Sequence, residues 1–232
     1  MQFDNKYEKQ MISIDISVFS IIENKLHVLL IKRATEPFKA MWSLVGGGVY
    51  NNETCENAVI RELKEKVNIT NIFPTLSGVF SEPTRDIRFR NISISYYCLT
   101  KNNLDFKNNE DKVVEAKWFP INNLPQLAFD HTQILNQALN LLKAKIYDIE
   151  FMKPYLPTTF TLGALQMIYE SILETSLDKR NFRRKLNSMN CLENTGEKNE
   201  LDSHRKSDIF RFKWFSLPPK KYINWNLIKL ML

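Results

Sequence analysis

The chain has 232 residues, of which 44% are hydrophobic and 25% charged, a composition that suits one or two globular domains and excludes a disordered or fibrous protein. The first ten residues carry no apolar signal core, and no apolar run reaches the roughly 18 residues that a membrane span needs, so we expect a cytoplasmic protein without a membrane partner. The net charge of +6 lies wholly in residues 151–232, which indicates either a polyanionic partner for that part or a solvated basic surface.

Residues 1–150 predict a mixed α/β domain. Apolar residues at every second position from Ile12 to Val18 predict a strand with one buried face, and Ser13, Asp15 and Ser17 fall on the other face. A turn at 23–25 leads into LHVLLIKR, a continuous apolar run typical of a central strand. Further strands are predicted in TLSGVF, ISISYYCLT and AKWFPI, and helices at about 54–67 and 131–144.

Residues 158–215 predict a second, smaller domain. Pro154 and Pro157 mark residues 151–157 as a linker. Thr161 and Asp178 are placed to cap two successive helices, and strand-like runs around CLEN and IFRFKWF follow, separated by a polar stretch. Helix, helix and hairpin is the order of a winged helix-turn-helix. The sequence predicts no role for the tail at 216–232.

The first domain contains a glycine-rich loop followed by a helix, GGGVYNNETCENAVIRELKEKVNI. This stretch resembles the Nudix box, G-x5-E-x7-R-E-U-x-E-E-x-G-U, where U is aliphatic. The matching residues are Gly47, Glu53, Arg61, Glu62, Leu63, Glu65 and Ile69. The chain departs from the pattern at Lys66, which replaces the last glutamate, and at Asn68, which replaces the glycine.

The two departures differ in their physical consequences. Positions 62, 65 and 66 share one helical face, where three carboxylates would hold Mg²⁺ against a diphosphate. Lys66 removes one ligand and adds an ammonium within reach of Glu62, so Glu62 and Glu65 remain as weak or vestigial metal ligands. We therefore expect no catalytic residues and no required cofactor, with any Mg²⁺ bound weakly. Asn68 tolerates the left-handed conformation that ends a helix, and the resemblance makes Glu53 and Arg61 a structural pair.

The second predicted helix of the small domain, in DKRNFRRKL, combines an apolar stripe with an arginine-rich outer face. A basic helix alone is more often a solvated surface, but one that follows a capped helix and precedes a hairpin favours a recognition helix for DNA. The candidate DNA-binding residues are Lys179, Arg180, Asn181, Arg183, Arg184, Arg205 and Lys206.

Together, the two predicted domains resemble the Nudix-related transcriptional regulators of the NrtR family, over roughly residues 10–213. The resemblance implies an α+β protein, with a Nudix α/β/α sandwich built on a mixed sheet and a C-terminal winged helix-turn-helix. It also implies a homodimer that binds operator DNA, represses genes of NAD metabolism and senses ADP-ribose or a related metabolite. A pentose such as arabinose is the alternative effector.

Candidate effector-binding residues follow from their places in the resemblance. A cluster of arginines beside a Nudix cleft can hold a diphosphate, although the same residues could line a charged loop. Arg33 and Trp42 offer a cation and a ring face, and His131 is interpreted as structural, capping a helix start with Asp130. The candidates are Arg33, Trp42, Gly47, Glu62, Arg85, Asp86, Arg88 and Arg90.

Two other functions stay open at this point. The first alternative is an active Nudix hydrolase of the ADP-ribose pyrophosphatase type, with an accessory C-terminal domain. The second is an RNA-binding or scaffold protein, which only the basic helix supports.

Overall fold

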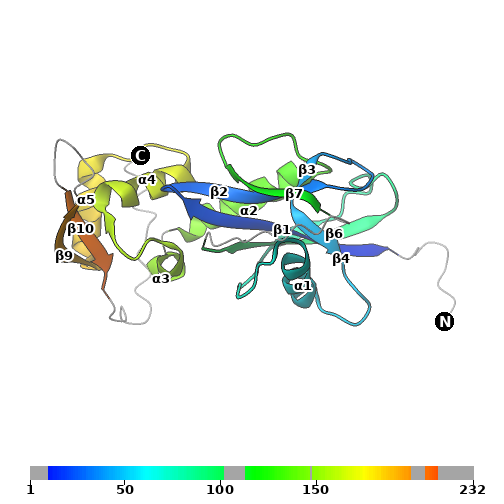
Figure 1. Cartoon of the computed structure of the whole chain (residues 1–232), viewed down its shortest axis with the longest axis horizontal. Helices are drawn as coiled ribbons and strands as arrows, with labels where there is room; N and C mark the ends of the chain where they lie inside the picture. Colours follow the sequence, from blue (N-terminus) through cyan, green and yellow to red (C-terminus); the bar gives the residue numbers. More distant parts are fainter. Residues whose placement is uncertain (1–9, 102–112, 147, 200–206, 214–232) are drawn as a thin grey trace. The chain divides into compact units, whose positions relative to one another are not determined.

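The computed structural model describes residues 10–101, 113–146, 148–199 and 207–213, and it divides the chain into two compact units (Figure 1). The first unit comprises Met1–Ile22 and Leu26–Leu141, and the second comprises Glu23–Lys25 and Leu142–Leu232. Two of the predicted DNA-binding residues, Arg205 and Lys206, and the tail at 216–232 lie outside the described residues. None of the helices in the described ranges is both long and apolar enough to cross a bilayer.

The first unit is built on a seven-stranded mixed sheet. Its strands are β1 (Met11–Ile22), β2 (Lys25–Arg33), β3 (Trp42–Ser43), β4 (Val45–Gly48), β5 (Thr75–Phe80), β6 (Asn91–Leu99) and β7 (Val113–Pro120). The main path runs β3-β2-β1-β6-β5, while β4 pairs with β1 and β7 pairs with β2. Strand β1 runs parallel to β6 and antiparallel to β4, so it lies at the centre of the sheet and brings the glycine-rich strand β4 beside its own start.

Helices α1 (Cys55–Val67) and α2 (His131–Lys145) cover opposite faces of this sheet. Because side chains alternate along a strand, Ile14 and Asp15 of β1 point to opposite faces. Ile14 lies in the same apolar core as Leu63 of α1, whereas the carboxylate of Asp15 lies 3.3 Å from His131, the first residue of α2. The prediction that β1 buries one face is therefore wrong, because helices cover both sides of the sheet.

The ends of α1 follow the local sequence. The Thr54 hydroxyl accepts a hydrogen bond from the Asn57 backbone N–H at 3.2 Å and so begins the helix. Asn68 has φ 53° and ψ 30°, the left-handed conformation that ends it. The predicted helix at 54–67 and the role of Asn68 as its terminator are confirmed.

The second unit has the helix, helix and hairpin order that the sequence predicts. Its elements are α3 (Ile149–Met152), the 3-10 helix η1 (Lys153–Tyr155), β8 (Phe160–Thr161), α4 (Leu162–Leu173), α5 (Lys179–Met189), β9 (Leu192–Asn199) and β10 (Ser207–Phe212). The strands form a sheet in the order β8-β10-β9. Thr161 caps α4 and Asp178 caps α5, each accepting a hydrogen bond from a backbone N–H three residues later.

Two details of the second unit differ from the sequence prediction. Residues 151–157, predicted as a linker, contain the second half of α3 and all of η1, because Met152 and Leu156 are apolar enough to be buried. Strand β9 also continues through the polar residues TGEKN, which were expected to separate the strands. Polar side chains are tolerated there because the strand pairs only with β10 and its residues are mostly exposed.

Candidate functional site

The glycine-rich strand β4 approaches its neighbours too closely for side chains. A Cβ at Gly46 would lie 2.3 Å from the carbonyl oxygen of Ile14, and a Cβ at Gly47 would lie 2.2 Å from Oε1 of Glu62. Both separations are shorter than van der Waals contact allows. The glycines therefore let β4 pair closely with β1 and leave room beside the strand for the carboxylate of Glu62.

Arg61 locks the loop that follows β4 onto helix α1. Its guanidinium donates to both carboxylate oxygens of Glu53, at 3.0 and 2.7 Å, and to the carbonyl oxygen of Gly48 at 3.0 Å. The Tyr50 ring centroid lies 3.9 Å from Cζ of Arg61. The hydrogen bonds that Arg61 donates to Glu53 lower the pKa of Glu53 and raise the pKa of Arg61. The predicted pairing of Glu53 with Arg61 is confirmed.

The acidic face of α1 is already occupied by positive charge. Glu62 is buried, with Arg61 Nη1 at 2.6 Å from one carboxylate oxygen and Lys66 Nζ at 2.9 Å from the other. Lys66 Nζ also donates to the carbonyl oxygen of Gly46. Glu65 is more exposed, and its carboxylate lies 3.7 Å from Arg61 Nη1. The predicted ion pair between Lys66 and Glu62 is therefore present.

These residues do not fit a Mg²⁺ ion. Mg²⁺ prefers oxygen ligands in octahedral geometry, and the point where Glu62 and the Gly46 carbonyl converge holds the Lys66 ammonium instead. In the part of the chain that the structure describes, no group of three or more His, Cys, Asp or Glu side chains could hold a metal. Glu62 and Glu65 thus occupy the sequence positions of metal ligands without being arranged as a metal site.

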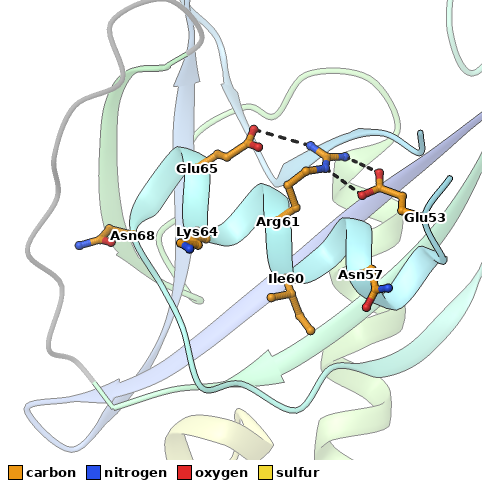
Figure 2. Close-up of a pocket in the computed structure, with 7 residues that line it drawn as sticks. All are labelled: Glu53, Asn57, Ile60, Arg61, Lys64, Glu65 and Asn68. Atoms are coloured by element: carbon orange, nitrogen blue, oxygen red, sulfur yellow. Dashed lines mark hydrogen bonds and ion pairs between the residues drawn. The ribbon is translucent and has the colours of Figure 1, made fainter. Parts of the chain in front are cut away.

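The outer face of α1 forms an open depression that includes the Arg61 bridge but neither Glu62 nor Lys66 (Figure 2). Arg61 lies between the carboxylates of Glu53 and Glu65. The depression is lined by Glu53, Asn57, Ile60, Arg61, Lys64, Glu65 and Asn68. It is a feature of the exposed helix surface, whereas Glu62 and Lys66 point toward the glycine strand.

Arg85 lies inside the first unit and bridges two carboxylates. It donates to both oxygens of Asp130, at 2.8 and 2.7 Å, and to Oδ2 of Asp15 at 3.2 Å. The Arg85 side chain is only 4% exposed, so its donors are committed to these two partners. Arg85 was a candidate for the effector pocket, and the structure places it in an interior network instead. Asp130 holds Arg85 with its side chain, so the expectation that this carboxylate caps α2 is wrong.

His131 completes the same network and has a defined tautomer. Its Nδ1 accepts a hydrogen bond from the backbone N–H of Leu44 at 3.0 Å, so Nε2 carries the proton and points to Asp15 Oδ1. Ser93 donates to the other oxygen of Asp15 at 2.6 Å. Burial alone would raise the pKa of Asp15. The charges and hydrogen bonds of His131, Ser93 and Arg85 outweigh burial and hold the pKa well below its ordinary value. His131 has a structural position, as expected, and Asp15 is the partner that the sequence did not reveal.

Two other arginines lie beside the ring of Phe129. Cζ of Arg33 lies 4.9 Å from the ring centroid, and Cζ of Arg88 lies 5.9 Å from it. Burial lowers the pKa of Arg33, and the neighbouring charge of Arg88 lowers it further. Asp86 offsets part of this charge through hydrogen bonds from Arg88 at 3.0 and 2.8 Å. Both guanidinium groups thus lie near one aromatic ring, which makes Arg33 and Arg88 candidates for contact with an anion.

The remaining effector candidates occupy ordinary structural environments. The Trp42 ring packs edge-on against Phe119, with centroids 4.7 Å apart, and Lys32 lies 5.9 Å from the Trp42 centroid. Arg90 donates to the carbonyl oxygen of Ser81. Phe129 itself has φ 54°, which fixes the chain direction just before α2.

In the second unit, the described DNA-binding candidates all lie on the exposed face of α5. Leu186 is buried, and Phe182 packs against Tyr169 of α4 with ring centroids 5.5 Å apart. Lys179 and Arg180 stand in the first turn, where the helix dipole disfavours positive charge. The exposed candidates on this helix are Lys179, Arg180, Asn181, Arg183 and Arg184.

Sequence comparisons match both units to described domain families. Residues 11–139 match the NUDIX domain, and residues 154–212 match the NrtR DNA-binding winged helix domain. The "ADPR responsive transcriptional repressor NtrR" of Acinetobacter baylyi is 29% identical over 214 residues, which are 89% of this chain and 83% of the relative. The ADP-ribose pyrophosphatase of Methanocaldococcus jannaschii is 43% identical over 128 residues, covering 53% of this chain and 72% of the enzyme.

Solved structures of NrtR from Shewanella oneidensis are also similar. The complex with a 27mer DNA has a TM-score of 0.67 and 28% identity, covering 87% of this chain and 93% of that chain. The NUDIX domain of the same protein complexed with ADP ribose has a TM-score of 0.54 and 28% identity, covering 60% and 94% respectively. The similarity to the regulator therefore extends over both units, whereas that to the pyrophosphatase covers about half of the chain.

Proposed function

The chain belongs to the NrtR family, which joins a NUDIX domain to a DNA-binding winged helix domain, and on that premise we propose that it is an ADP-ribose-responsive transcriptional repressor. It binds operator DNA as a homodimer through the winged helix domain and leaves the operator when the effector occupies the NUDIX domain. Its targets are genes of NAD metabolism, and it acts in the cytoplasm.

The observation that carries this proposal is the exposed basic face of α5. Positive charges in the first turn of a helix oppose the helix dipole, so Lys179 and Arg180 do not serve helix stability. They suit a helix whose N-terminal residues face phosphates and base edges in the major groove. Among the partners considered, double-stranded DNA is the polyanion that matches this arrangement.

ADP-ribose is favoured over a neutral pentose by the charge beside Phe129. Arg33 and Arg88 provide two guanidinium groups near one ring, and a diphosphate can accept hydrogen bonds from both. A pentose offers no charge to stabilise them. We assign these two arginines to the diphosphate, with Asp86 holding Arg88 in position.

The DNA-binding assignment predicts the effect of a double substitution. Arg180→Ala with Arg184→Ala removes two exposed cations from α5, and we expect operator affinity to fall at least about tenfold, because each lost contact to a phosphate or base weakens binding. Fluorescence anisotropy with the upstream DNA of its own gene, at several salt concentrations, measures the affinity and its salt dependence. ADP-ribose affinity should be unchanged.

A matched control removes the same charge from the first unit. Lys39→Ala with Lys64→Ala takes two exposed lysines away from the NUDIX domain and should leave operator affinity within about twofold of the wild type. If the α5 variant retains wild-type affinity with an unaltered salt dependence, α5 is not the recognition helix.

The rival function, an active pyrophosphatase, differs from the proposed function in that it releases AMP from ADP-ribose. The 43% identity to the Methanocaldococcus jannaschii enzyme is the observation that favours it. Incubation with ADP-ribose and Mg²⁺, followed by chromatography for AMP, tests hydrolysis directly. We expect no rapid AMP formation, because the Lys66 ammonium occupies the acidic face of α1. Rapid turnover together with no sequence preference for DNA would reverse the choice between the two functions.

A further inference from the structure

Lys66 is buried to an unusual degree for a lysine. Its side chain is 12% exposed, although lysine side chains normally remain in water. The ammonium contacts two oxygen atoms from different elements, the carboxylate of Glu62 on α1 and the backbone carbonyl of Gly46 on β4. A lysine that is only solvated would extend away from the glycine strand.

The surroundings of this ammonium are those of a cation site. A buried carboxylate and a backbone carbonyl oxygen are ligands that hard cations prefer. Gly47 provides the space, because a Cβ there would overlap the Glu62 carboxylate. The ammonium has three N–H donors, of which one is donated to the Gly46 carbonyl, and it forms an ion pair with Glu62 Oε2 at 2.9 Å, so a donor remains that can bond a ligand oxygen.

We propose that Lys66 is a built-in cation of the NUDIX domain, which replaces a divalent metal and lets the protein bind its effector without one. The proposal rests on the function proposed above, because it assumes a diphosphate ligand. Together with Arg61, the ammonium offsets the negative charge of Glu62 that would repel that ligand, and it cannot supply the metal-activated water that hydrolysis of a diphosphate uses. Binding without cleavage then follows from a single side chain.

Binding of Mn²⁺ alone tests whether Lys66 fills the cation position. We expect the wild type to bind little Mn²⁺ by electron paramagnetic resonance, and Lys66→Glu to bind one ion at least about tenfold more tightly, because the variant has three carboxylates on one helical face. Lys64→Glu is the control, since it makes the same charge change on the exposed face of α1. If Lys66→Glu binds Mn²⁺ no more tightly than the wild type, the proposal is overturned.

Calorimetry with ADP-ribose tests the consequence for the effector. The wild-type affinity should be the same in EDTA and in Mg²⁺, whereas Lys66→Glu should bind ADP-ribose only with the metal. Lys66→Met, which keeps the aliphatic stem without the charge, should lose at least about tenfold in affinity under both conditions. Circular dichroism of each variant establishes that it is folded.

The two proposals fail in different ways. If the wild type binds ADP-ribose only in Mg²⁺, the effector assignment stands and the built-in cation is wrong. If the wild type binds no ADP-ribose under either condition, the effector assignment is wrong, and the Mn²⁺ measurement alone decides the role of Lys66.

Discussion

The single residue Arg61 holds the loop that follows β4 in place, and it does so without a role in chemistry. Its guanidinium joins Gly48 at the end of β4 and Glu53 of the following loop to Glu62 of the helix, and all these contacts lie between 2.6 and 3.0 Å. The contacts of Arg61 with Glu53 and Gly48 do not involve Lys66. A regulator can change the metal-binding position and keep the shape of the site.

Replacement of Arg61 by methionine should lower the free energy of unfolding by about 1–3 kcal/mol, because the buried carboxylate of Glu62 loses one of its two cationic partners. Urea unfolding followed by tryptophan fluorescence measures the change. Lys64→Met on the exposed face of the same helix is the control and should change stability by less than about 0.5 kcal/mol. Equal stability of the two variants would contradict the locking role of Arg61.

The interior network at Asp15 predicts a pH dependence with a defined sign. The folded-state pKa of Asp15 lies below its ordinary value, so the folded chain binds fewer protons there than the unfolded chain. The resulting stabilisation is present above about pH 4 and is lost as the pH falls below that value. Urea midpoints measured between pH 7 and pH 3 should fall less steeply in Asp15→Asn than in the wild type.

A surface carboxylate provides the comparison for this experiment. Asp208 is exposed on β10, and Asp208→Asn should follow the wild-type pH profile. An Asp15→Asn profile parallel to that of the wild type would show that Asp15 is not the group responsible. The variant is expected to be less stable at pH 7, because Arg85 then has one ionised partner instead of two.

Among the helices and strands, most of what the sequence could predict came from the spacing of apolar residues and from helix-capping residues. The helices α1, α2, α4 and α5 have apolar stripes, and the structure confirms the predicted cap residues Thr161 and Asp178 of α4 and α5. Burial was harder to predict. The two-sided burial of β1 depends on which helices cover the sheet, and short α3 has too few residues to show a period.

At the candidate site, contacts between residues close in the sequence could be predicted, and contacts between distant residues could not. Spacing predicted the ion pair between Lys66 and Glu62, which are four residues apart on one helix, and the family resemblance predicted the pairing of Glu53 with Arg61. Arg85 meets Asp15 across 70 residues and Asp130 across 45, and no local pattern encodes such a meeting. An aspartate inside an apolar strand was the available signal, because a charge there needs a partner.

The end of α1 offers a test at this scale. Asn68→Ala should destabilise the protein by about 1 kcal/mol, because its φ of 53° crowds the Cβ and alanine lacks the local hydrogen bonding that helps asparagine adopt it. Asn68→Gly, which carries no Cβ, should be neutral or slightly stabilising. Thermal unfolding of the pair isolates backbone strain from loss of the amide, and a matching loss in both variants would assign the effect to the amide.

For the whole molecule, coupling between effector and operator must be reciprocal. If ADP-ribose lowers operator affinity by some factor, operator DNA must lower ADP-ribose affinity by the same factor. Titrating ADP-ribose by calorimetry with and without saturating operator, and operator by anisotropy with and without ADP-ribose, gives the two factors independently. Unrelated DNA is the control. Unequal factors would show that the two ligands do not share one two-state equilibrium.

The homodimer can be tested through the geometry of the operator. A symmetric pair of recognition helices reads two half-sites about 34 Å apart, or about 10 base pairs. We expect light scattering to give twice the 27.3 kDa chain mass. Insertion of five base pairs between the half-sites should abolish tight binding, while insertion of about ten should restore part of it. Unchanged binding with both insertions would indicate that each chain binds alone.

The absence of a side chain at Gly47 has a consequence for how this protein can change over generations. The space beside β4 still accommodates a carboxylate on α1, and the codons for lysine and glutamate differ only in their first base. One nucleotide substitution at position 66 would restore the missing acidic residue. The regulator thus remains a single mutational step from the acidic helix face that a hydrolase requires.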